Sequence, residues 1–533
     1  MKKGTWQMGL GLCAALSVAL TLGSALAVTG PSQEELNNAD NATDSWLMYN
    51  KGYKAQRYSS LDQINSGNVA QLKAVCTYET GDDVGFQVTP QMYKGVLFFT
   101  QANRTFAVDA RTCKALWVNK YMMDSSSVLT TNRGIAIADG VIYRGTPNAH
   151  LIALDAGTGK LLWDTKGDDS TVGYFLSSAP IYSGGKVFIG DAGADWGIKA
   201  KMYAFDAKTG NKAWQFDMIP TGSKVGADTW KKVDSTVTGG GSMWTSYTLD
   251  TGTNQLYISV GNPAPDFAAQ YRPGHNLFTN TVTVLDADTG KYSHHYQQIP
   301  NDDKDYDTSA APVLYDLDGQ KRMAVVTKAG WLFGYNEDDK SQVFKQAMIK
   351  VDNQQKPTTR EGLPVCPNYS AGSQWSGPSY NPAMKVLFTN AVDWCGVVKL
   401  GEVRLIKGQL FFGGAMQLDP ASKAIGSTMA YDAATGKPMW RYDLPGIRIV
   451  GGVTSTAGNL VLSGAMNGTF YALDATTGKV LFKDNIDKAP IGGGVSTYDI
   501  SGKQYLAVAA GNTSKGTAGV KNPGARIVIY SLP

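Results

Sequence analysis

The sequence predicts an all-β propeller, and three observations carry this prediction. A motif Ala-x-Asp-Ala-x-Thr-Gly recurs along the 533 residues, an aromatic residue follows at a fixed distance, and long amphipathic helical periodicity is missing from the sequence. The clearest copies are residues 153–159 leading to Trp163, 204–210 leading to Trp214 and 430–436 leading to Trp440. Looser copies occupy residues 107–117, 284–290 and 472–482.

Each copy reads as a β-hairpin. Apolar alternation leads into an Asp-x-x-Thr-Gly turn and out again, with Asp and Thr binding local backbone N–H groups and Gly taking positive φ. The repeated unit is therefore a small antiparallel sheet. A Trp or Phe beyond the turn is suited to wedge between neighbouring sheets, where it buries much apolar area.

The spacing of the copies indicates a closed ring. The turn aspartates are Asp109, Asp155, Asp206, Asp286, Asp432 and Asp474, and the short intervals of 42 to 51 residues between them match one four-stranded propeller blade. The longer intervals leave room for degenerate blades, such as the worn copy at residues 332–336. We expect seven or eight blades, and because no linker divides the chain, a single domain from residue 28 to 533.

The N-terminus predicts an export signal. Lys2 and Lys3 precede an apolar run over residues 8–26, and Ala25-Leu26-Ala27 offers a small-x-small cleavage site. A membrane anchor is the alternative, but the strongly apolar part is shorter than the roughly 20 residues that a span needs. We therefore expect a signal peptide at residues 1–27, cleaved near Ala27, a periplasmic location and no stable membrane insertion.

Four cysteines follow the predicted signal, and in an exported protein they indicate two disulfides. Three pairings are open, and closeness in the chain favours Cys76 with Cys113 and Cys366 with Cys395. No Cys-x-x-Cys-His motif occurs, so we expect no covalently attached c-type haem. The formal net charge of +4 is too small to indicate nucleic acid as a partner.

Chemistry is indicated by loops that depart from the repeat. The four histidines have no metal-ligand spacing, and no nucleophile elbow occurs. Instead, carboxylates and amides gather in loops at residues 190–197, 261–265 and 301–307, the first two directly after predicted strands at 186–189 and 255–260. A hard cation needs several oxygen ligands of this type. Taken singly, each loop also fits a solvated turn.

The loops, their order and the repeats together resemble the pyrroloquinoline quinone (PQQ)-dependent alcohol dehydrogenases. The resemblance extends from Trp46 to Pro533. Its motifs include Arg57-Tyr58-Ser59, Asn132-Arg133-Gly134, Gly261-Asn262-Pro263-Ala264-Pro265, Arg272-Pro273-Gly274 and Gly502-Lys503-Gln504-Tyr505. This resemblance implies an eight-bladed β-propeller with tryptophan-docking repeats, and it supports the pairing of Cys366 with Cys395.

The resemblance also implies a cofactor site. Trp244 would be the flat face on which the quinone lies, since a tricyclic aromatic cofactor needs an apolar stacking surface. The other implied cofactor-binding residues are Gln87, Arg133, Ser177, Gly193, Ala194, Lys328, Gln374 and Trp375. A core position for Trp244 and a surface position for Lys328 are the alternatives.

A metal site is implied at Asp195, Asn262, Asp305 and Asp307. Asp195 stands where the family commonly has Glu and is one methylene shorter, so that the ion must move closer or a water must intervene. Asp307, two residues after Asp305, is a pattern associated with lanthanide-using members, because a trivalent ion favours extra negative charge. We expect Ca²⁺, with a lanthanide ion as the alternative.

The implied function is oxidation of an alcohol to an aldehyde or ketone. Asp305 would act as general base, and Lys328 would stabilise negative charge on the quinone oxygen. Because the chain has no haem motif, electrons would pass to a separate cytochrome c or a similar acceptor. The alternative is a non-catalytic propeller scaffold in envelope assembly, since a fold alone implies no activity.

Three departures from the family pattern touch the cofactor pocket. Serines at positions 125–127 stand where many members have adjacent cysteines, Gln87 where Glu is usual, and Val450 where several relatives have Trp. Because the adjacent cysteines and the Trp of these relatives are missing, we predict a pocket wider than methanol needs. A bulky, secondary or polyol substrate is therefore expected.

Overall fold

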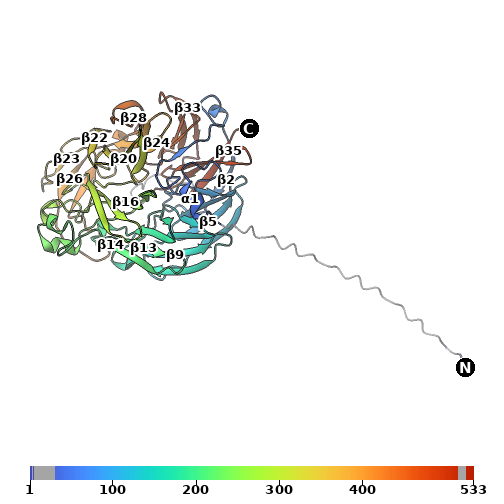
Figure 1. Cartoon of the computed structure of the whole chain (residues 1–533), viewed down its shortest axis with the longest axis horizontal. Coiled ribbons are helices and arrows are strands. Elements are labelled where there is room, and N and C mark those ends of the chain that lie inside the picture. Colours follow the sequence, from blue (N-terminus) through green and yellow to red (C-terminus); the bar gives the residue numbers. More distant parts are fainter. Residues whose placement is uncertain (3, 5–29, 514–523) are drawn as a thin grey trace.

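The chain forms a ring of eight four-stranded antiparallel sheets around one centre (Figure 1). The structure is a computed structural model that describes residues 1–2, 4, 30–513 and 524–533. The sheets follow one another around the ring in chain order, so that the red strands of the C-terminal end lie beside the blue strands of the N-terminal end (Figure 1). The predicted eight-bladed, all-β propeller is confirmed, and within the described residues the only α-helix is α1, Gln33–Asn37.

Each blade runs from an innermost to an outermost strand. In that order, the first four blades are β3 (Gln91–Tyr93), β4 (Val96–Gln101), β5 (Arg104–Asp109) and β6 (Ala115–Lys120); β7 (Ala136–Ala138), β8 (Val141–Gly145), β9 (His150–Asp155) and β10 (Leu161–Lys166); β11 (Ile181–Ser183), β12 (Lys186–Gly190), β13 (Lys201–Asp206) and β14 (Lys212–Asp217); and β15 (Tyr247–Asp250), β16 (Gln255–Val260), β17 (Thr281–Asp286) and β18 (Tyr292–Gln297).

The other four blades complete the ring. They are β19 (Val313–Leu317), β20 (Gln320–Val326), β21 (Trp331–Asn336) and β22 (Gln342–Ala347); β24 (Ser379–Asn381), β25 (Val386–Asp393), β28 (Ile425–Asp432) and β29 (Pro438–Pro445); β30 (Thr454–Thr456), β31 (Leu460–Gly464), β32 (Thr469–Asp474) and β33 (Val480–Asn485); and β34 (Val495–Ile500), β35 (Lys503–Ala510), β36 (Arg526–Ser531) and β2 (Lys73–Glu79). Single turns of 3₁₀-helix occupy Val69–Gln71, Ser170–Val172, Ala194–Trp196, Ala227–Thr229, Val233–Val237, Ala269–Tyr271 and Ala421–Lys423.

Neighbouring blades are joined by the aromatic residue of the repeat. The indole of Trp163 donates a hydrogen bond to the carbonyl of Ala207 in the next blade at 3.1 Å. The same ring packs on Gly210, where a Cβ would lie 2.8 Å from it, so only glycine fits beneath the indole. Equivalent contacts join Trp117 to Gly159, Trp214 to Gly290, Phe344 to Gly436 and Trp440 to Gly478. The predicted wedge between blades is confirmed.

The Asp-x-x-Thr-Gly turns form as predicted. The carboxylate of Asp206 accepts the backbone N–H and the hydroxyl of Thr209, both at 2.8 Å. Gly210 follows with a φ of +73°. A local hydrogen-bond network therefore sets each turn, and the positive φ favours glycine.

The ring is closed by an N-terminal strand. β2 pairs antiparallel with β36 as the outermost strand of the last blade. Cys76 of β2 is disulfide-bonded to Cys113, in the turn between β5 and β6 of the first blade, with Cα atoms 5.8 Å apart. The predicted pair is present, and it ties the first blade to the last.

A buried segment over residues 46–59 fills the centre of the ring. The carbonyls of Tyr53, Lys54, Gln56 and Arg57 accept N–H groups from β15, β19, β24 and β30, the innermost strands of four blades. The segment ends in β1 (Tyr58–Ser59), which pairs in parallel with β30.

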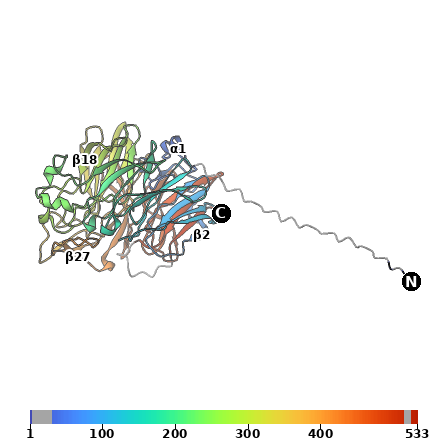
Figure 2. The same ribbon diagram turned by 90° about the horizontal axis from the view of Figure 1, so that it is seen from below.

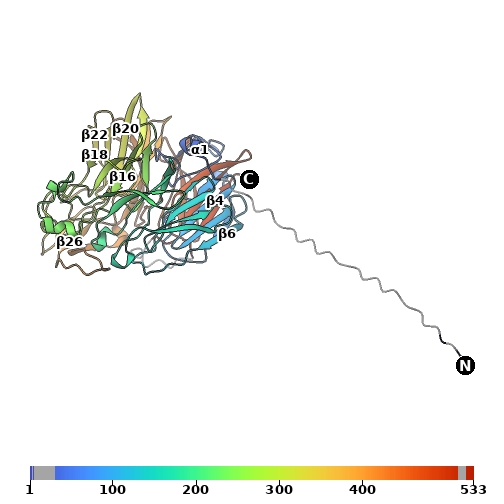
Figure 3. The same ribbon diagram turned by 60° about the horizontal axis from the view of Figure 1, so that its bottom comes forward.

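An additional sheet is inserted into the sixth blade. It consists of β23 (Leu363–Val365), β26 (Gly396–Leu400) and β27 (Gly414–Leu418). Seen from the side, α1 and this sheet lie toward opposite ends of the ring (Figure 2, Figure 3). The insertion therefore covers one end only.

The predicted signal peptide, with Cys13 and the cleavage position near Ala27, falls on residues outside the described part of the chain. Among the residues that the structure does describe, no helix has the length and apolar character needed to cross a membrane.

Candidate cofactor and metal site

The predicted site residues come from two recurring positions in the blades. Gln87, Arg133, Ser177, Trp244 and Trp375 each lie three or four residues before an innermost strand. A second set follows the second strand of a blade and consists of Gly193, Ala194, Asp195, Asn262 and Lys328. Because the first two strands of a blade are antiparallel, the start of one and the end of the other lie at the same edge. The fold therefore gathers both sets at one end of the ring.

These side chains enclose a cavity of about 190 Å³. All the residues predicted for the site line it except Asp305 and Gln374. Asp305 lies behind the wall, in contact with Lys328. The side-chain amide of Gln374 donates to the carbonyl of Ala371 at 2.6 Å and is not part of the lining, so a direct cofactor contact by this residue is not supported by its position.

Trp244 lies against two cations in the cavity wall. The guanidinium carbon of Arg133 is 4.7 Å from the indole centroid, and the ammonium of Lys328 is 5.4 Å from it. Arg133 also donates to the hydroxyl of Ser177 at 3.2 Å and to the side-chain oxygen of Gln87. Its Nε is buried and has no hydrogen-bond partner in the described part of the chain. A planar aromatic surface thus lies beside an arginine with an unused donor.

Lys328 is held between two acidic side chains. Its ammonium is 2.9 Å from Asp305 Oδ1 and 2.6 Å from Asp307 Oδ2. Burial raises the pKa of Asp305, and the charge of Lys328 opposes that rise. The two carboxylates hold the pKa of Lys328 above its ordinary value despite its burial, so the ammonium stays charged.

Asp305 and Asp307 are positioned by their loop. Asp305 has a left-handed backbone conformation with a φ of 59°, which Asp adopts more readily than most residues. Asp307 accepts the backbone N–H of Asn262 at 2.5 Å. A Cβ at Gly261 would lie 2.7 Å from the same carboxylate, so glycine in the Gly-Asn-Pro motif permits this close approach.

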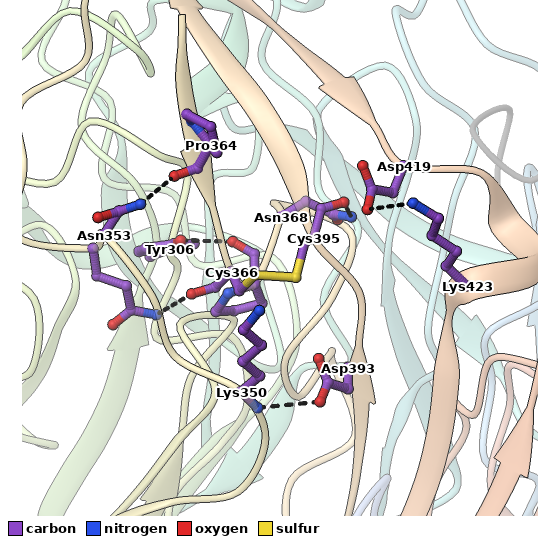
Figure 4. Close-up of a disulfide and its surroundings, with 12 residues drawn as sticks. Tyr306, Lys350, Asn353, Pro364, Cys366, Asn368, Asp393, Cys395, Asp419 and Lys423 are labelled. Carbon is purple, nitrogen blue, oxygen red and sulfur yellow. Dashed lines mark hydrogen bonds and ion pairs between the residues drawn. A yellow bond between two sulfur atoms is a disulfide. The ribbon is translucent and has the colours of Figure 1, made fainter.

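A disulfide supports this loop from the inserted sheet. Cys366 and Cys395 are bonded, as predicted, with Cα atoms 4.4 Å apart (Figure 4). The hydroxyl of Tyr306, between the two acids of the loop, donates to the carbonyl of Pro367 at 2.6 Å. The cross-linked segment is therefore fastened directly to the loop that carries Asp305.

Three carboxylates converge beside Lys328. One oxygen from each of Asp195, Asp266 and Asp305 lies within 4.8 Å of the others. Burial raises the pKa of Asp195, whereas Lys328 and a hydrogen bond from the Asn262 amide lower it. This spacing suits a cation bound between the carboxylates.

Asp266 was not among the predicted site residues. It lies in the loop after β16, four residues beyond Asn262, and its side chain is fully buried. An acid in a loop is ordinarily solvated, and nothing in the surrounding sequence indicates that this one is enclosed. Its position after the Gly-Asn-Pro motif was the only signal that could have suggested it.

The residues that depart from the family pattern each have their own place and contacts in the structure. The hydroxyl of Ser125 is hydrogen-bonded to Asp124 and Ser170, and none of the serines at positions 125–127 lines the cavity. Val450 is buried in the apolar cluster that includes Trp375. Gln87 keeps its contact with Arg133, as a neutral partner.

Two family models match different parts of the chain. The family model described as "Glucose/ethanol/alcohol dehydrogenase, beta-propeller domain" matches residues 46–344. A second model, described as "Outer membrane protein assembly factor BamB", matches residues 426–517. The first match covers more than half of the chain and includes every predicted site residue except Gln374 and Trp375.

Curated relatives and solved structures agree with this match. The chain is 29% identical to quinohemoprotein alcohol dehydrogenase ADH IIB of Pseudomonas putida, over 100% of this chain and 83% of the relative. It is 30% identical to methanol dehydrogenase (cytochrome c) subunit 1 of Methylobacterium organophilum, over 93% of this chain and 88% of the relative. A solved structure of a europium-containing methanol dehydrogenase superposes with a TM-score of 0.86 at 26% identity, over 94% of this chain and 100% of that one.

Proposed function

Because the chain belongs to the family of PQQ-dependent alcohol dehydrogenases, we propose that it oxidises an alcohol in the cavity beside Trp244. The observation that carries this proposal is Lys328, which lies over that indole and pairs with both Asp305 and Asp307. A buried cation that is paired with a base and lies beside an aromatic platform provides the groups that quinone-dependent oxidation requires.

The residues present fit the cofactor that the family uses. PQQ is planar and carries several carboxylates, and the cavity offers the Trp244 face together with the Arg133 guanidinium, whose Nε is buried without a partner among the described residues. A buried donor without an acceptor is costly, and an acidic ligand at this place would satisfy it. Trp244, Arg133 and Ser177 are therefore the residues proposed to hold the cofactor, with Gln87, Gly193, Ala194 and Trp375 completing its walls.

The residues also fit a metal ion. We propose Asp195, Asn262, Asp305 and Asp307 as its ligand residues, because carboxylate and amide oxygens are the donors that Ca²⁺ and lanthanide ions prefer. The two buried oxygens of Asp266 have no hydrogen-bond partner among the described residues, which supports a cation in this place. When bound beside these residues, PQQ would supply a hydride acceptor and the ion would supply a Lewis acid for it.

Two side chains of the protein, Asp305 and Lys328, are proposed to accept the proton and to stabilise the developing negative charge. Asp305 is proposed to accept the hydroxyl proton of the alcohol at its carboxylate, and its burial strengthens it as a base. Lys328 stabilises negative charge on the bound acceptor, since its ammonium is buried and held in place by two acids. Asp305 and Lys328 are both buried, and their low-polarity surroundings strengthen both interactions.

The substrate, acceptor and location are further parts of the proposal. The proposed alcohol is bulkier than methanol, because Val450 and the serines at positions 125–127 stand where relatives have a larger Trp and adjacent cysteines. A separate cytochrome c is the proposed electron acceptor, because the sequence contains no haem motif. Two disulfides support export to the periplasm, where oxidised cysteines persist.

Reconstitution tests the proposal. Purified apoprotein is loaded with PQQ and either Ca²⁺ or a lanthanide, and dye reduction is measured with methanol and with larger primary, secondary and polyol alcohols. We expect activity that depends on both additions, with kcat/KM highest for a larger alcohol. A ranking with methanol first contradicts the substrate proposal.

The base is tested by Asp305→Asn, with the exposed acid Asp316→Asn as control. We expect the first variant to bind PQQ and to lose at least about 100-fold in kcat, as is typical for a general base. The control should keep the activity of the unmodified protein. Full activity of Asp305→Asn with bound PQQ contradicts the assignment.

A further inference from the structure

Asp266 is a buried acid without a protein partner among the described residues. Its side chain is fully buried, and neither carboxylate oxygen has a hydrogen-bond partner in the described part of the chain. The neighbouring cation, Lys328, is already bonded to Asp305 and Asp307. An isolated carboxylate in such a place is strongly destabilising unless another group compensates it.

The backbone around Asp266 is fixed on both sides. Arg272 donates to the carbonyls of Pro265 and Asp266 at 3.1 and 3.3 Å, so the guanidinium binds the main chain and leaves the carboxylate free. The next residue, Phe267, donates its N–H to the carbonyl of Phe412 at 2.8 Å. The side chain is thus held in its orientation by contacts that do not involve its own oxygens.

Phe412 lies in the loop between β26 and β27 of the inserted sheet, and the same loop also binds the main chain of Asp195. The N–H of Phe411 donates to the carbonyl of Asp195 at 2.6 Å, one residue before the contact between Phe412 and Phe267. Two acid-bearing loops from different blades are therefore fastened to two consecutive residues. As a result, Asp195 and Asp266 come close enough for one ion to bind both, together with Asp305.

We propose that Asp266 is a ligand of the metal ion, and that the resulting site prefers a trivalent lanthanide ion to Ca²⁺. This inference rests on the proposed function, because it concerns the ion of the same site. Asp266 supplies an oxygen donor beside Asp195, whose side chain is shorter than the Glu common in the family. With Asp305, three carboxylates face the ion directly, and a fourth, Asp307, adds its charge from the contact with Lys328.

The preference for a trivalent ion follows from charge. Asp195, Asp266, Asp305 and Asp307, together with the ammonium of Lys328, give the buried cluster a formal net charge of about −3, which a trivalent ion balances and a divalent ion does not. Ligand charge is also one of the properties by which protein sites tune their affinity for hard cations. Lanthanide ions accept the same oxygen donors as Ca²⁺ and carry one charge more.

Terbium binding tests the inference without turnover. Metal-free full-length protein is titrated with Tb³⁺, whose luminescence is excited through nearby tryptophans such as Trp244, and Ca²⁺ is then added as competitor. Luminescence lifetimes in H₂O and D₂O give the number of water molecules on the bound ion. The variants are Asp266→Asn, Asp266→Ala and, as a buried acid outside the site, Asp191→Asn.

We expect one Tb³⁺ bound to the unmodified protein, and roughly a 100-fold excess of Ca²⁺ or more to displace half of it. Asp266→Asn should weaken Tb³⁺ binding at least about tenfold, because the amide lacks the charge, and Asp266→Ala, which lacks the oxygen donor, should also add about one water molecule to the ion. Asp191→Asn should bind Tb³⁺ like the unmodified protein. Equal Tb³⁺ affinity in Asp266→Asn with equal hydration in Asp266→Ala, or displacement of Tb³⁺ by equimolar Ca²⁺, overturns the inference.

The melting temperature shows whether Asp266→Asn binds Tb³⁺ weakly because it is misfolded. Without metal, Asp266→Asn should melt close to the temperature of the unmodified protein, because the substitution replaces one buried polar group without a hydrogen-bond partner among the described residues by another of the same size. On addition of Tb³⁺, its rise in melting temperature should be smaller. If the unmodified protein needs a metal for PQQ-dependent dye reduction but Asp266→Asn binds Tb³⁺ with unchanged affinity, Asp266 is not a ligand and the proposed function stands. If neither Tb³⁺ nor Ca²⁺ binds and no alcohol reduces the dye, both are wrong.

Discussion

Replacing Lys328 with Met tests whether the buried ion-pair network stabilises the metal-free protein. The ammonium lies 2.9 Å from Asp305 and 2.6 Å from Asp307, and all three side chains are at most 10% exposed. Removing it leaves two buried carboxylates without a counter-charge. Breaking a buried pair in this way costs about 3–5 kcal/mol.

The expected shift in melting temperature follows from that cost. Globular proteins unfold with an entropy of about 2.1 cal/mol/K per residue, so that roughly 500 folded residues give about 1 kcal/mol/K. The loss therefore corresponds to a fall of about 3–5 °C in Tm for the metal-free variant. Differential scanning calorimetry on EDTA-treated protein measures it.

Two comparisons make the result specific. Lys54→Met removes an exposed lysine that pairs with Asp316, and it should change Tm by less than about 1 °C, as is usual for a surface pair. Addition of Tb³⁺ should narrow the gap between Lys328→Met and the unmodified protein, because the ion supplies the missing positive charge. A metal-free Lys328→Met protein that melts within about 1 °C of the unmodified protein refutes the reasoning.

Three further outcomes test the scaffold. Gly210→Ala should lower the unfolding free energy by about 1–3 kcal/mol more than Gly184→Ala in urea titrations, because both sites have positive φ but only the first faces an indole. Loss of the disulfide in a Cys76→Ser, Cys113→Ser double variant should lower the free energy of unfolding by about 2–4 kcal/mol. Free thiols at both positions in the unmodified protein, measured by non-reducing mass spectrometry, would contradict the pairing. Burial raises the pKa of Asp191 to about 8, so stability should fall as pH rises from about 4 to 8, and Asp191→Asn should flatten this decline in urea midpoints.

The sequence by itself determined the architecture of this protein. The Asp-x-x-Thr-Gly turn is a local structure, set by hydrogen bonds within four residues, as at Asp206 and Thr209. Its recurrence, with an aromatic residue such as Trp163 behind it, was enough to predict a ring of small sheets. The two disulfide pairs were also correctly predicted, because short loops make neighbouring cysteines the favoured partners.

The site was predicted through a resemblance, and the fold decided how its members meet. Lys328 and Asp305 are 23 residues apart in the chain, and they meet because both lie at the same end of one blade. Gln374, placed by the same resemblance, turns its amide to the main chain instead of the cavity. Sequence order indicated the loops, but not the direction of each side chain.

Only the tertiary structure could identify Asp266. Whether a loop carboxylate is solvated or enclosed depends on distant segments, and here the residue after Asp266 is hydrogen-bonded to Phe412, more than 140 residues away in the sequence. Local patterns determine turns and strands because their hydrogen bonds are local. The burial of a site and its net charge depend on residues that are far apart in the sequence, and these residues meet only when the ring has closed.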